Sequence, residues 1–507
     1  MFFHVDKRSS TPAYIQIEES IRKLIAQGVL RTGTRLPGRR ELARDLGVNR
    51  ITINKALQRL ETEGLISSKV GNGTFVSIAA VAPPTPAAMR EADDESLLRI
   101  WGPLFTHPRP VPRALPSITP RKKGISTVSF VYAAPPPDLF PADDFRRCVD
   151  YTIKRRVNDI CRIGPPDGLP SLKEHLVRWL AQHGIFASER NIVVTTGCQQ
   201  SLDLIRKTLV YPGDSLLLEN PTFPGAVGAL SPSGTGLLEM PLQEEGPDAR
   251  VLNALGTRNR CKLIYVSPTF QNPTGRTMPT ETRAQLVEMA LQYGIPIIED
   301  DVFGQLRYDG PVQPSLYSMC PNLVMYIGSF SKMLSPGLRL GWIVAPIPVA
   351  AQLAVTKQAS DLHTGMLIQA AMDEFCRRGL MMRHLKRMRR VFRNRRDAMA
   401  EALQRWFPTD ARWHVPQGGL SMWVTLPGDW DTEELLAAAQ EGGVQFVPGS
   451  AFYFRSAPTN SMRLSFATES EQAIIQGIKT LSEIISRRRS RAPQVGHRIP
   501  ETHRAIV

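Results

Sequence analysis

Cysteine is scarce in this sequence, and the few cysteines follow no redox or metal-binding pattern. Among the 507 residues there are 6 cysteines, with no CxxC pair and no spacing typical of metal ligands. A disulfide framework and a structural zinc site are therefore not expected. We expect reduced, mostly buried thiols in a cytoplasmic protein, and no bound metal.

Long apolar runs are missing as well. No run of about 18 apolar residues occurs, and the first residues, MFFHVDKRSS, lack the apolar centre of a signal peptide. These absences argue against a membrane span and against secretion. The hydrophobic content of 42% and the charged content of 21% are those of a globular protein, and 507 residues exceed one ordinary core. We therefore expect two or more domains.

Charge is distributed unevenly along the chain. The formal net charge is +15, and residues 1–76 hold 13 lysines and arginines against 7 acidic residues. A second basic cluster near the C-terminus consists of Arg487, Arg488, Arg489 and Arg491. Such an excess favours a polyanionic partner, either nucleic acid or a membrane surface. For the C-terminal cluster, solubility alone is an equally good interpretation.

The first 78 residues have the pattern of a winged helix-turn-helix domain. Apolar residues at helical spacing predict a helix within 12–30, a short helix follows that ends at Gly47, and another runs from Asn49 to Gly64. The stretch LISSKVGNGTFVSI then predicts a two-stranded wing. The residues that we expect to touch double-stranded DNA are Arg39, Arg40, Asn49, Arg50, Thr52, Lys55 and Gly73. A purely structural three-helix cap is the alternative.

The rest of the chain divides into three parts. Residues 79–124 are rich in proline and charge and predict a linker, whereas residues 125–486 alternate apolar strands with amphipathic helices. That alternation predicts an α/β body with a large, mostly parallel sheet and a smaller α+β unit. We expect residues 487–507 to form a disordered basic tail. The basic helix Arg377–Asp397 either has a solvated face, which we favour, or touches DNA.

Lys332 lies in the most informative stretch of the chain, GSFSKMLSPGLRLGW. A lysine amine bonds covalently to an aldehyde, and the hydroxyls of Ser329 and Ser331 and the guanidinium of Arg339 suit a phosphate. This arrangement predicts a site for pyridoxal 5′-phosphate, a phosphorylated aldehyde, with Lys332 as its catalytic residue.

Further segments supply the other groups that such a cofactor needs. Cys198 and Gln199 begin a helix after a strand, where backbone N–H groups favour phosphate, and Phe223 follows a strand where it can stack on a ring. Asn272 can bond the ring hydroxyl, and Asp300 can pair with a protonated pyridine nitrogen. Arg463, on a predicted strand, suits the carboxylate of a substrate or effector. Each residue alone also has a structural interpretation as a core, turn or capping residue.

Two resemblances to known families support these interpretations. Residues 12–76, from PAYIQIEESIRK to GNGTFV, resemble the GntR-type winged helix, with Gly38 standing where that family often has a capping serine or threonine. Residues 125–486 resemble fold-type-I aminotransferases of the aromatic and aminoadipate branch. The combined order resembles the MocR subfamily of bacterial regulators, and this resemblance implies a pyridoxal-phosphate-dependent transcription factor that forms a homodimer.

Two departures from the aminotransferase branch concern the cofactor site. Phe303 and Ile163 stand where that branch often has tyrosines that contact the ring oxygen and, across a dimer, the phosphate. These losses favour a site that binds and senses an amino compound, or the cofactor itself, with weak or no turnover. An active aminotransferase that carries a DNA-binding domain is the alternative, and a cofactor-free repressor is disfavoured because Lys332 and Asp300 are both present. The sequence does not specify the effector or the operator.

Overall fold

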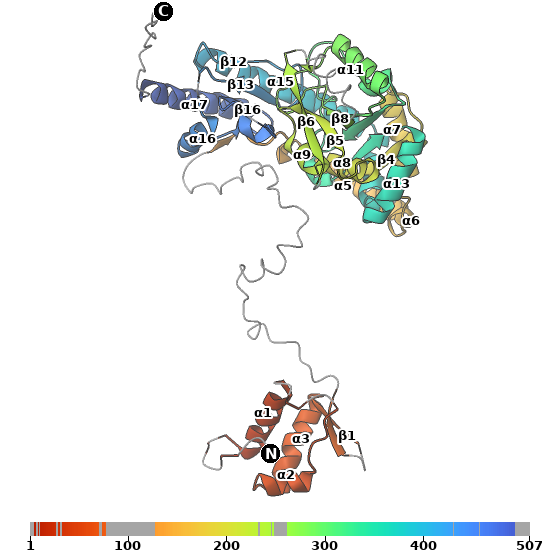
Figure 1. Cartoon of the computed structure of the whole chain (residues 1–507), viewed down its shortest axis with the longest axis vertical. Helices are drawn as coiled ribbons and strands as arrows, with labels where there is room; N and C mark the ends of the chain where they lie inside the picture. The colour runs from red at the N-terminus through yellow and green to blue at the C-terminus, as the bar shows by residue number, and fades with distance from the viewer. Residues whose placement is uncertain are drawn as a thin grey trace, which may run out of the picture. The chain divides into compact units, whose positions relative to one another are not determined.

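The computed structural model separates the chain into two compact units, Met1–Thr106 and His107–Val507 (Figure 1). The structure describes residues 5–6, 9, 11–26, 29–30, 33–69, 73–77, 127–231, 234–244, 246–247, 261–428, 430–455 and 457–491. The predicted linker, residues 79–124, lies outside the described residues. The first unit is called the head below, and the second unit is called the body.

The head is a three-helix unit with a two-stranded wing. Its elements are α1 (Ala13–Ala26), α2 (Arg39–Asp45), α3 (Arg50–Thr62), β1 (Ile66–Lys69) and β2 (Gly73–Val76). The core is formed by one apolar face of each helix, and Ile17, Leu42 and Ile53 have no exposed surface. The predicted winged helix-turn-helix is confirmed.

Local capping explains where α2 and α3 begin. The Asn49 side chain accepts a hydrogen bond from the Ile51 backbone N–H at 2.9 Å, which satisfies one of the free donors at the start of α3. Gly38 offers no such side chain to α2, but Glu41 accepts from the Gly38 N–H at 3.2 Å. At the start of α2, the hydrogen bond from the Gly38 N–H to Glu41 is therefore present, and the reciprocal bond from a capping side chain is missing. The helix still begins at Arg39.

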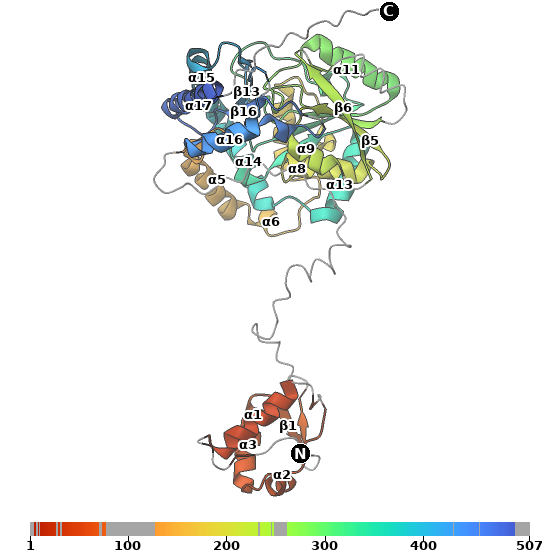
Figure 2. The same cartoon turned by 60° about the vertical axis from the view of Figure 1, so that its left-hand side comes forward.

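The body contains an eight-stranded sheet with helices on both faces (Figures 1 and 2). The strand order is β4-β11-β10-β9-β8-β5-β6-β7, in which β11 and β7 run antiparallel to their neighbours. The strands are β4 (Ile192–Thr195), β5 (Ser215–Asn220), β6 (Gly236–Gln243), β7 (Gly246–Pro247), β8 (Cys261–Val266), β9 (Ile297–Asp300), β10 (Val324–Ser329) and β11 (Gly341–Val344). The predicted α/β class with a mostly parallel sheet is confirmed.

Alternate residues of each strand enter two different hydrophobic cores. On β9, for example, Ile297 packs into the larger core and Ile298 into the smaller one. The helices over this sheet are α5 (Ala142–Arg155), α6 (Val157–Ile160), α7 (Pro170–Ala181), α8 (Cys198–Leu209), α9 (Pro224–Leu230), α11 (Thr280–Tyr293), α12 (Leu316–Met319), α13 (Ile347–Asp361) and α14 (Met366–Arg377). Short 3-10 turns cover Pro137–Leu139, Glu189–Asn191, Pro336–Leu338 and Gly449–Phe452.

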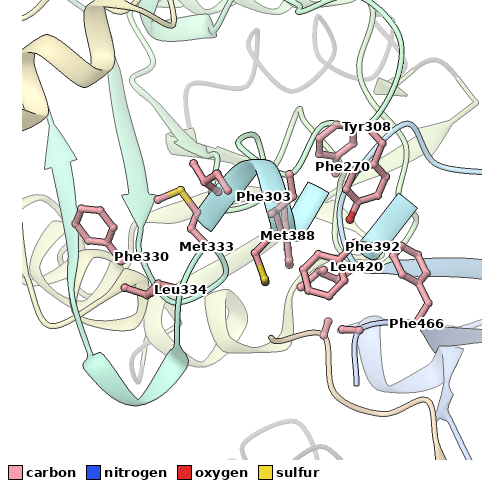
Figure 3. Close-up of a cluster of buried hydrophobic side chains, with 14 of the residues drawn as sticks. Phe270, Phe303, Tyr308, Phe330, Met333, Leu334, Met388, Phe392, Leu420 and Phe466 are labelled. Carbon is pink, nitrogen blue, oxygen red and sulfur yellow. The ribbon is translucent and has the colours of Figure 1, made fainter. Parts of the chain in front are cut away.

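A smaller α+β part completes the body. Its sheet has the order β12-β13-β16-β15, and β14 pairs in parallel with the early strand β3. The elements are β3 (Val128–Ser129), α15 (Leu380–Trp406), β12 (Arg412–Trp413), β13 (Ser421–Thr425), α16 (Thr432–Glu441), β14 (Val444–Gln445), β15 (Val447–Pro448), β16 (Ser461–Ser465) and α17 (Glu471–Arg491). Figure 3 shows Met388, Phe392, Leu420 and Phe466 meeting side chains of the larger part in one apolar cluster.

The C-terminal boundary differs from the prediction. We expected a disordered tail from residue 487, but α17 continues without a break to Arg491. Arg487 and Arg488 face Glu483 and Glu434, each at 3.9 Å, and basic residues in the last turn also suit the helix dipole. Residues 492–507 lie outside the described part.

Two general features of the described residues bear on function. None of their helices combines the length and apolarity that crossing a lipid bilayer requires. Among the same residues, no group of three or more His, Cys, Asp or Glu side chains has an arrangement suited to a metal ion.

Candidate cofactor site and nucleic-acid interface

A cavity of about 180 Å³ opens at the carboxyl edge of the large sheet. Asp300 and Ser329 are the last residues of β9 and β10, and Cys198 begins the helix that follows β4. Parallel strands end at one edge of a sheet, so these groups converge although they are far apart in sequence. All predicted cofactor residues line this cavity, namely Lys332, Asp300, Asn272, Phe223, Cys198, Gln199, Ser329 and Arg339.

Lys332 is held in a loop whose neighbours anchor it in the core. Phe330, Met333 and Leu334 are at most 2% exposed, and Figure 3 shows them in the apolar cluster. The Lys332 Nζ donates a hydrogen bond to the Ala133 carbonyl at 2.8 Å and makes no ion pair with a described residue. Burial and the positive charge of Arg463 lower the pKa of Lys332 to about 8. The amine is therefore partly neutral near physiological pH, as a nucleophile must be.

This lowered pKa predicts the pH dependence of cofactor capture. As the pH rises through about 8, Lys332 loses its proton, and the neutral amine becomes the main form. In cofactor-free protein, the rate at which pyridoxal phosphate bonds to the chain should rise roughly tenfold from pH 7 to pH 9, as for an amine with a pKa near 8. Stopped-flow absorbance measures it. A rate that keeps rising steeply beyond pH 9, as for an ordinary lysine, would contradict the geometry.

Asp300 is a buried carboxylate with two side-chain donors. Tyr265 donates its hydroxyl to Asp300 Oδ2 at 2.7 Å, and the Cys198 thiol approaches the same oxygen at 3.4 Å. Burial raises the pKa of Asp300, and the Tyr265 and Cys198 hydrogen bonds oppose that rise. Both donors favour an ionised carboxylate that is poised to pair with a cationic ring nitrogen.

The other end of the cavity is suited to an anion. Gly197 has φ +97° just before α8, and a Cβ there would lie 3.1 Å from Arg339 Nη2. Glycine therefore lets the arginine approach the N–H groups at the start of this helix. The Ser331 Oγ is buried without a hydrogen-bond partner beside the cavity, which leaves it free for a ligand oxygen.

Ser329 is used differently from Ser331. Its hydroxyl donates to the Leu340 carbonyl at 3.3 Å and accepts from the Ser331 N–H at 3.1 Å. These bonds stabilise the turn that carries Lys332, whereas the Ser331 hydroxyl forms no hydrogen bond with a described residue. A role for either serine in phosphate binding stays a prediction, and of the two hydroxyls only that of Ser331 lacks a partner among the described residues.

Phe223 and Asn272 line the cavity, whereas Arg463 does not line it and reaches it through its hydrogen bond to Asn272. Phe223 caps α9 and lies so close to Gly225 that a Cβ there would meet its ring at 2.4 Å. Arg463 is 3% exposed and donates to Asn272 Oδ1 at 3.0 Å and to the Val131 carbonyl at 2.7 Å. The Asn272 oxygen is thereby occupied, which leaves its amide N–H groups for a ligand.

The guanidinium of Arg463 is incompletely satisfied. Its Nε is buried without a hydrogen-bond partner, and burial lowers the pKa of Arg463 to about 10. A desolvated cation that forms no ion pair with any described residue favours an anionic ligand.

Sequence reasoning missed two further residues that line the cavity. Tyr265 holds Asp300, and the Ser267 hydroxyl donates to the Asp300 backbone carbonyl at 3.1 Å. Both belong to the apolar stretch CKLIYVSP, in which a tyrosine is expected to be an ordinary core residue. The available signal was their spacing of two residues, which places both side chains on one face of the strand.

In the head, four of the predicted DNA-contacting residues are exposed, namely Arg40, Asn49, Arg50 and Lys55. Two of these also have a partner, because the Asn49 side chain caps α3 and Lys55 Nζ lies 4.0 Å from the Tyr14 ring centroid. Arg39 is half-buried and donates to Asn54 Oδ1 at 3.3 Å. Thr52 is half-buried, at about 200° from Arg50 around a helix of 3.6 residues per turn. Gly73 begins β2 with φ +106°, beside residues 70–72, which lie outside the described part.

Two residues of the head were missed. Ile51 is 73% exposed next to Arg50, an unusual place for a large apolar side chain unless it meets a partner such as a thymine methyl group. Arg35 lies against the wing, since a Cβ on Gly73 would be 2.8 Å from Arg35 Nε. Both add candidate contacts to the surface around Arg50.

Comparison with known proteins agrees with both sites. Residues 147–481 match the family of class I and II aminotransferases, and residues 13–76 match the bacterial regulatory proteins of the gntR family. The 2-aminoadipate transaminase of Thermus thermophilus is 35% identical over 71% of this chain and 90% of that protein. The crystal structure of LysN, the α-aminoadipate aminotransferase of Thermus thermophilus complexed with N-(5′-phosphopyridoxyl)-L-leucine, matches with 33% identity, covers 77% of this chain and 99% of that chain, and has a TM-score of 0.70.

Proteins with both parts are similar over nearly the whole length. The probable rhizopine catabolism regulatory protein MocR of Rhizobium meliloti is 29% identical over 94% of each chain. The HTH-type transcriptional regulator TauR of Rhodobacter capsulatus is 30% identical over 92% of this chain and 96% of that protein. The chain belongs to the MocR subfamily of GntR-type regulators, within the class I and II aminotransferase family. This MocR-type regulator binds DNA, and its aminotransferase-like body takes pyridoxal 5′-phosphate as cofactor.

Proposed function

We propose that the body of this regulator senses a small amino compound with a carboxylate, and that binding of this effector changes how the heads bind DNA. The observation that carries the proposal is Arg463, a buried cation whose Nε donor is unused and whose Nη1 donates at 3.0 Å to Asn272, a residue of the cofactor cavity. A structural arginine in a core normally has all its donors satisfied. An α-amino acid supplies the missing anion and places its amino group toward the cofactor.

Each residue of the cavity has a proposed role. The cofactor, when bound, supplies an aldehyde that bonds an amine, and Lys332 is that amine in the absence of effector. Asp300, oriented by Tyr265, pairs with the ring nitrogen, and the Asn272 amide binds the ring hydroxyl. Phe223 would hold the flat ring by stacking, and Cys198, Gln199, Ser329 and Arg339 would hold the phosphate.

The proposal also includes the domain boundaries and the coupling between effector binding and DNA binding. We assign residues 1–78 to the DNA-binding head, 79–124 to the linker and 125–486 to the body, with the body's last helix continuing to Arg491. An effector shifts DNA binding only if it binds one arrangement of the regulator better than another. Exchange of the amine at Lys332 for the amine of the effector, and occupation of Arg463, are changes of charge and packing that can provide this difference.

We also propose a homodimer formed through an exposed apolar surface of the body. Tyr151, Ile153, Val157 and Ile163 follow one another through α5, α6 and the next loop, and they are 36%, 49%, 50% and 79% exposed. Large apolar side chains that stay exposed along one stretch of the chain favour an interface there. A dimer would place two heads on paired half-sites, as expected for a regulator of this class.

Substitution of Arg50 tests the role of the head. Arg50→Ala should weaken binding to a selected duplex by about 1–3 kcal/mol if the side chain contacts a base edge at the start of α3. Fluorescence anisotropy with the full-length protein measures the affinity. Arg44→Ala removes an arginine that is 81% exposed on α2 and should leave affinity unchanged. Equal affinities for Arg50→Ala and wild type would remove Arg50 from the interface.

An active aminotransferase is the second candidate function. It is favoured by the similarity to the 2-aminoadipate transaminase and by the presence of Lys332, Asp300 and Arg463. It is disfavoured by Phe303, which is 5% exposed and puts a ring without a hydroxyl 5.7 Å from the Lys332 Nζ. Effector screening by the visible spectrum, run beside DNA-binding and transamination assays, separates the two. Steady conversion of an amino acid and a keto acid, with DNA binding unaffected by either, would overturn the sensor.

A further inference from the structure

The long helix α15 of the body carries an unusual arrangement of positive charge. It has nine lysines and arginines in 27 residues, and its first acidic residue is Asp397. The helix packs against α17 in the smaller part of the body (Figure 2). On sequence alone, a solvated basic face was the favoured interpretation of this region.

The structure divides eight of these cations into two groups, and the ninth, Arg405, lies 5.2 Å from the centroid of the Trp406 ring near the end of the helix. Four of the eight turn toward the body and have partners there. Arg389 donates to the Gln305 carbonyl at 2.7 Å, Arg393 and Arg396 pair with Asp309 at 2.8 and 2.6 Å, and Arg395 donates to the Ala467 carbonyl. These residues join α15 to the rest of the body and are explained by the fold.

The cations of the second group do not join α15 to other described parts of the body. This group consists of Arg383, Lys386, Arg387 and Arg390, called the basic stripe here, and all four side chains are exposed. No side-chain hydrogen bond or ion pair links any of them to a described residue. Their spacing of i, i+3, i+4 and i+7 places them on one face of the helix, over a rise of about 10 Å.

This arrangement is unfavourable for an isolated helix. Like charges three and four residues apart repel each other, and no acidic side chain of α15 lies among them. The stripe also begins in the first turn of α15, where the helix dipole favours anions and no acidic residue is present. A surface that served solubility alone would mix both signs, as the basic end of α17 does with its glutamates. The stripe is therefore suited to a polyanion.

We propose that the basic stripe binds the phosphate backbone of duplex DNA that flanks the sequence read by the head. Over about 10 Å, duplex DNA presents about six phosphate charges, which matches a row of four cations. The head and the body are parts of one chain, so DNA held by the head is at high effective concentration for the stripe. The proposal rests on DNA binding by the head, and it adds a second, sequence-independent contact. DNA is favoured over an acidic membrane because the chain already binds DNA.

The test compares two variants of the full-length protein that lose the same charge. One replaces Arg383, Lys386, Arg387 and Arg390 by alanine. The matched control replaces four exposed cations elsewhere on the body that also have no side-chain partner among the described residues, Arg190, Lys262, Arg412 and Lys479. The probe is a duplex selected from a random-sequence library by the wild-type protein, used once without flanks and once with about 40 base pairs of mixed sequence on each side.

On the flanked duplex, the slope of log affinity against log salt should become shallower by about 2–4 in the stripe variant, since each lost phosphate contact removes about 0.9. The control should keep nearly the wild-type slope, and the short duplex should bind all three proteins alike. Equal slopes for the stripe variant and the control would overturn the proposal. So would an unchanged DNA slope together with lost binding to phosphatidylserine vesicles, which would assign the stripe to membranes. A wrong assignment of DNA binding to the head would give a different result. In that case Arg50→Ala would bind the short duplex with the same affinity as the wild type.

Discussion

Lys332→Ala should abolish the visible absorbance of the purified regulator. Lys332 Nζ is the amine that lines the cavity beside Asp300, and its pKa of about 8 makes it the reactive amine there. Without it, pyridoxal phosphate has no amine to bond and is retained only by non-covalent contacts. Hydride reduction followed by mass spectrometry should find the cofactor on Lys332 in wild-type protein and on no lysine in the variant.

The control for this experiment is a second buried lysine of the same body. Lys357 has no exposed surface, but its Nζ pairs with Asp361 at 2.7 Å and does not line the cavity. Lys357→Met should lose stability yet keep the absorbance band when folded. A band that persists in Lys332→Ala, or a wild type that stays colourless with added pyridoxal phosphate, would refute the assignment of Lys332.

Arg463→Ala should weaken the response to carboxylate-bearing effectors by about 10- to 100-fold, because a hydrogen-bonded charge pair contributes about 1.5–3 kcal/mol. The guanidinium is positioned by Val131 and Asn272, and its remaining donors are available to the carboxylate. The spectral response to L-leucine measures the loss. Isopentylamine, which is leucine without its carboxylate, should bind the variant and the wild type about equally.

The two ligands separate a specific effect from general damage. If the variant loses both ligands to the same extent, Arg463 supports the site through Asn272 and does not bind the carboxylate. Arg455→Ala serves as the matched variant, since Arg455 lies on the same part of the body, is exposed and, among the described residues, donates to the Leu237 carbonyl alone. It should respond to both ligands as the wild type does.

Most of the cofactor site could be predicted because its residues stand at ends of strands. Asp300 ends one predicted apolar strand and Lys332 follows another. Ionisable residues at these positions are easily recognised because the residues before them are mostly apolar. Tyr265 could not be predicted in this way, because a tyrosine inside an apolar strand cannot be distinguished from a core residue by sequence. Its hydrogen bond to Asp300 identifies its role. Both serines before Lys332 could be predicted as phosphate ligands, but the unsatisfied hydroxyl of Ser331 is distinguishable from the engaged hydroxyl of Ser329 only when both surroundings are known.

The helix α15 illustrates the opposite situation. Its composition alone suggested a solvated basic face, because nine cations on one helix look alike in a sequence. Contacts with Gln305, Asp309 and Ala467, from distant parts of the chain, distinguish four structural cations from the four of the basic stripe. In the head, the Tyr14 ring similarly engages Lys55, which the sequence left on the outer face of its helix.

The sequence by itself determined the two kinds of domain, the alternation of strands and helices, and the lysine that reacts with the cofactor. These follow from periodicity and from residue chemistry, which are local properties of the chain. Only the tertiary structure decided which donors are already satisfied, which cation is buried without a counter-ion, and which charges remain free on the surface. Those properties depend on contacts between residues that are hundreds of positions apart, such as Arg463 with Val131 and Asn272.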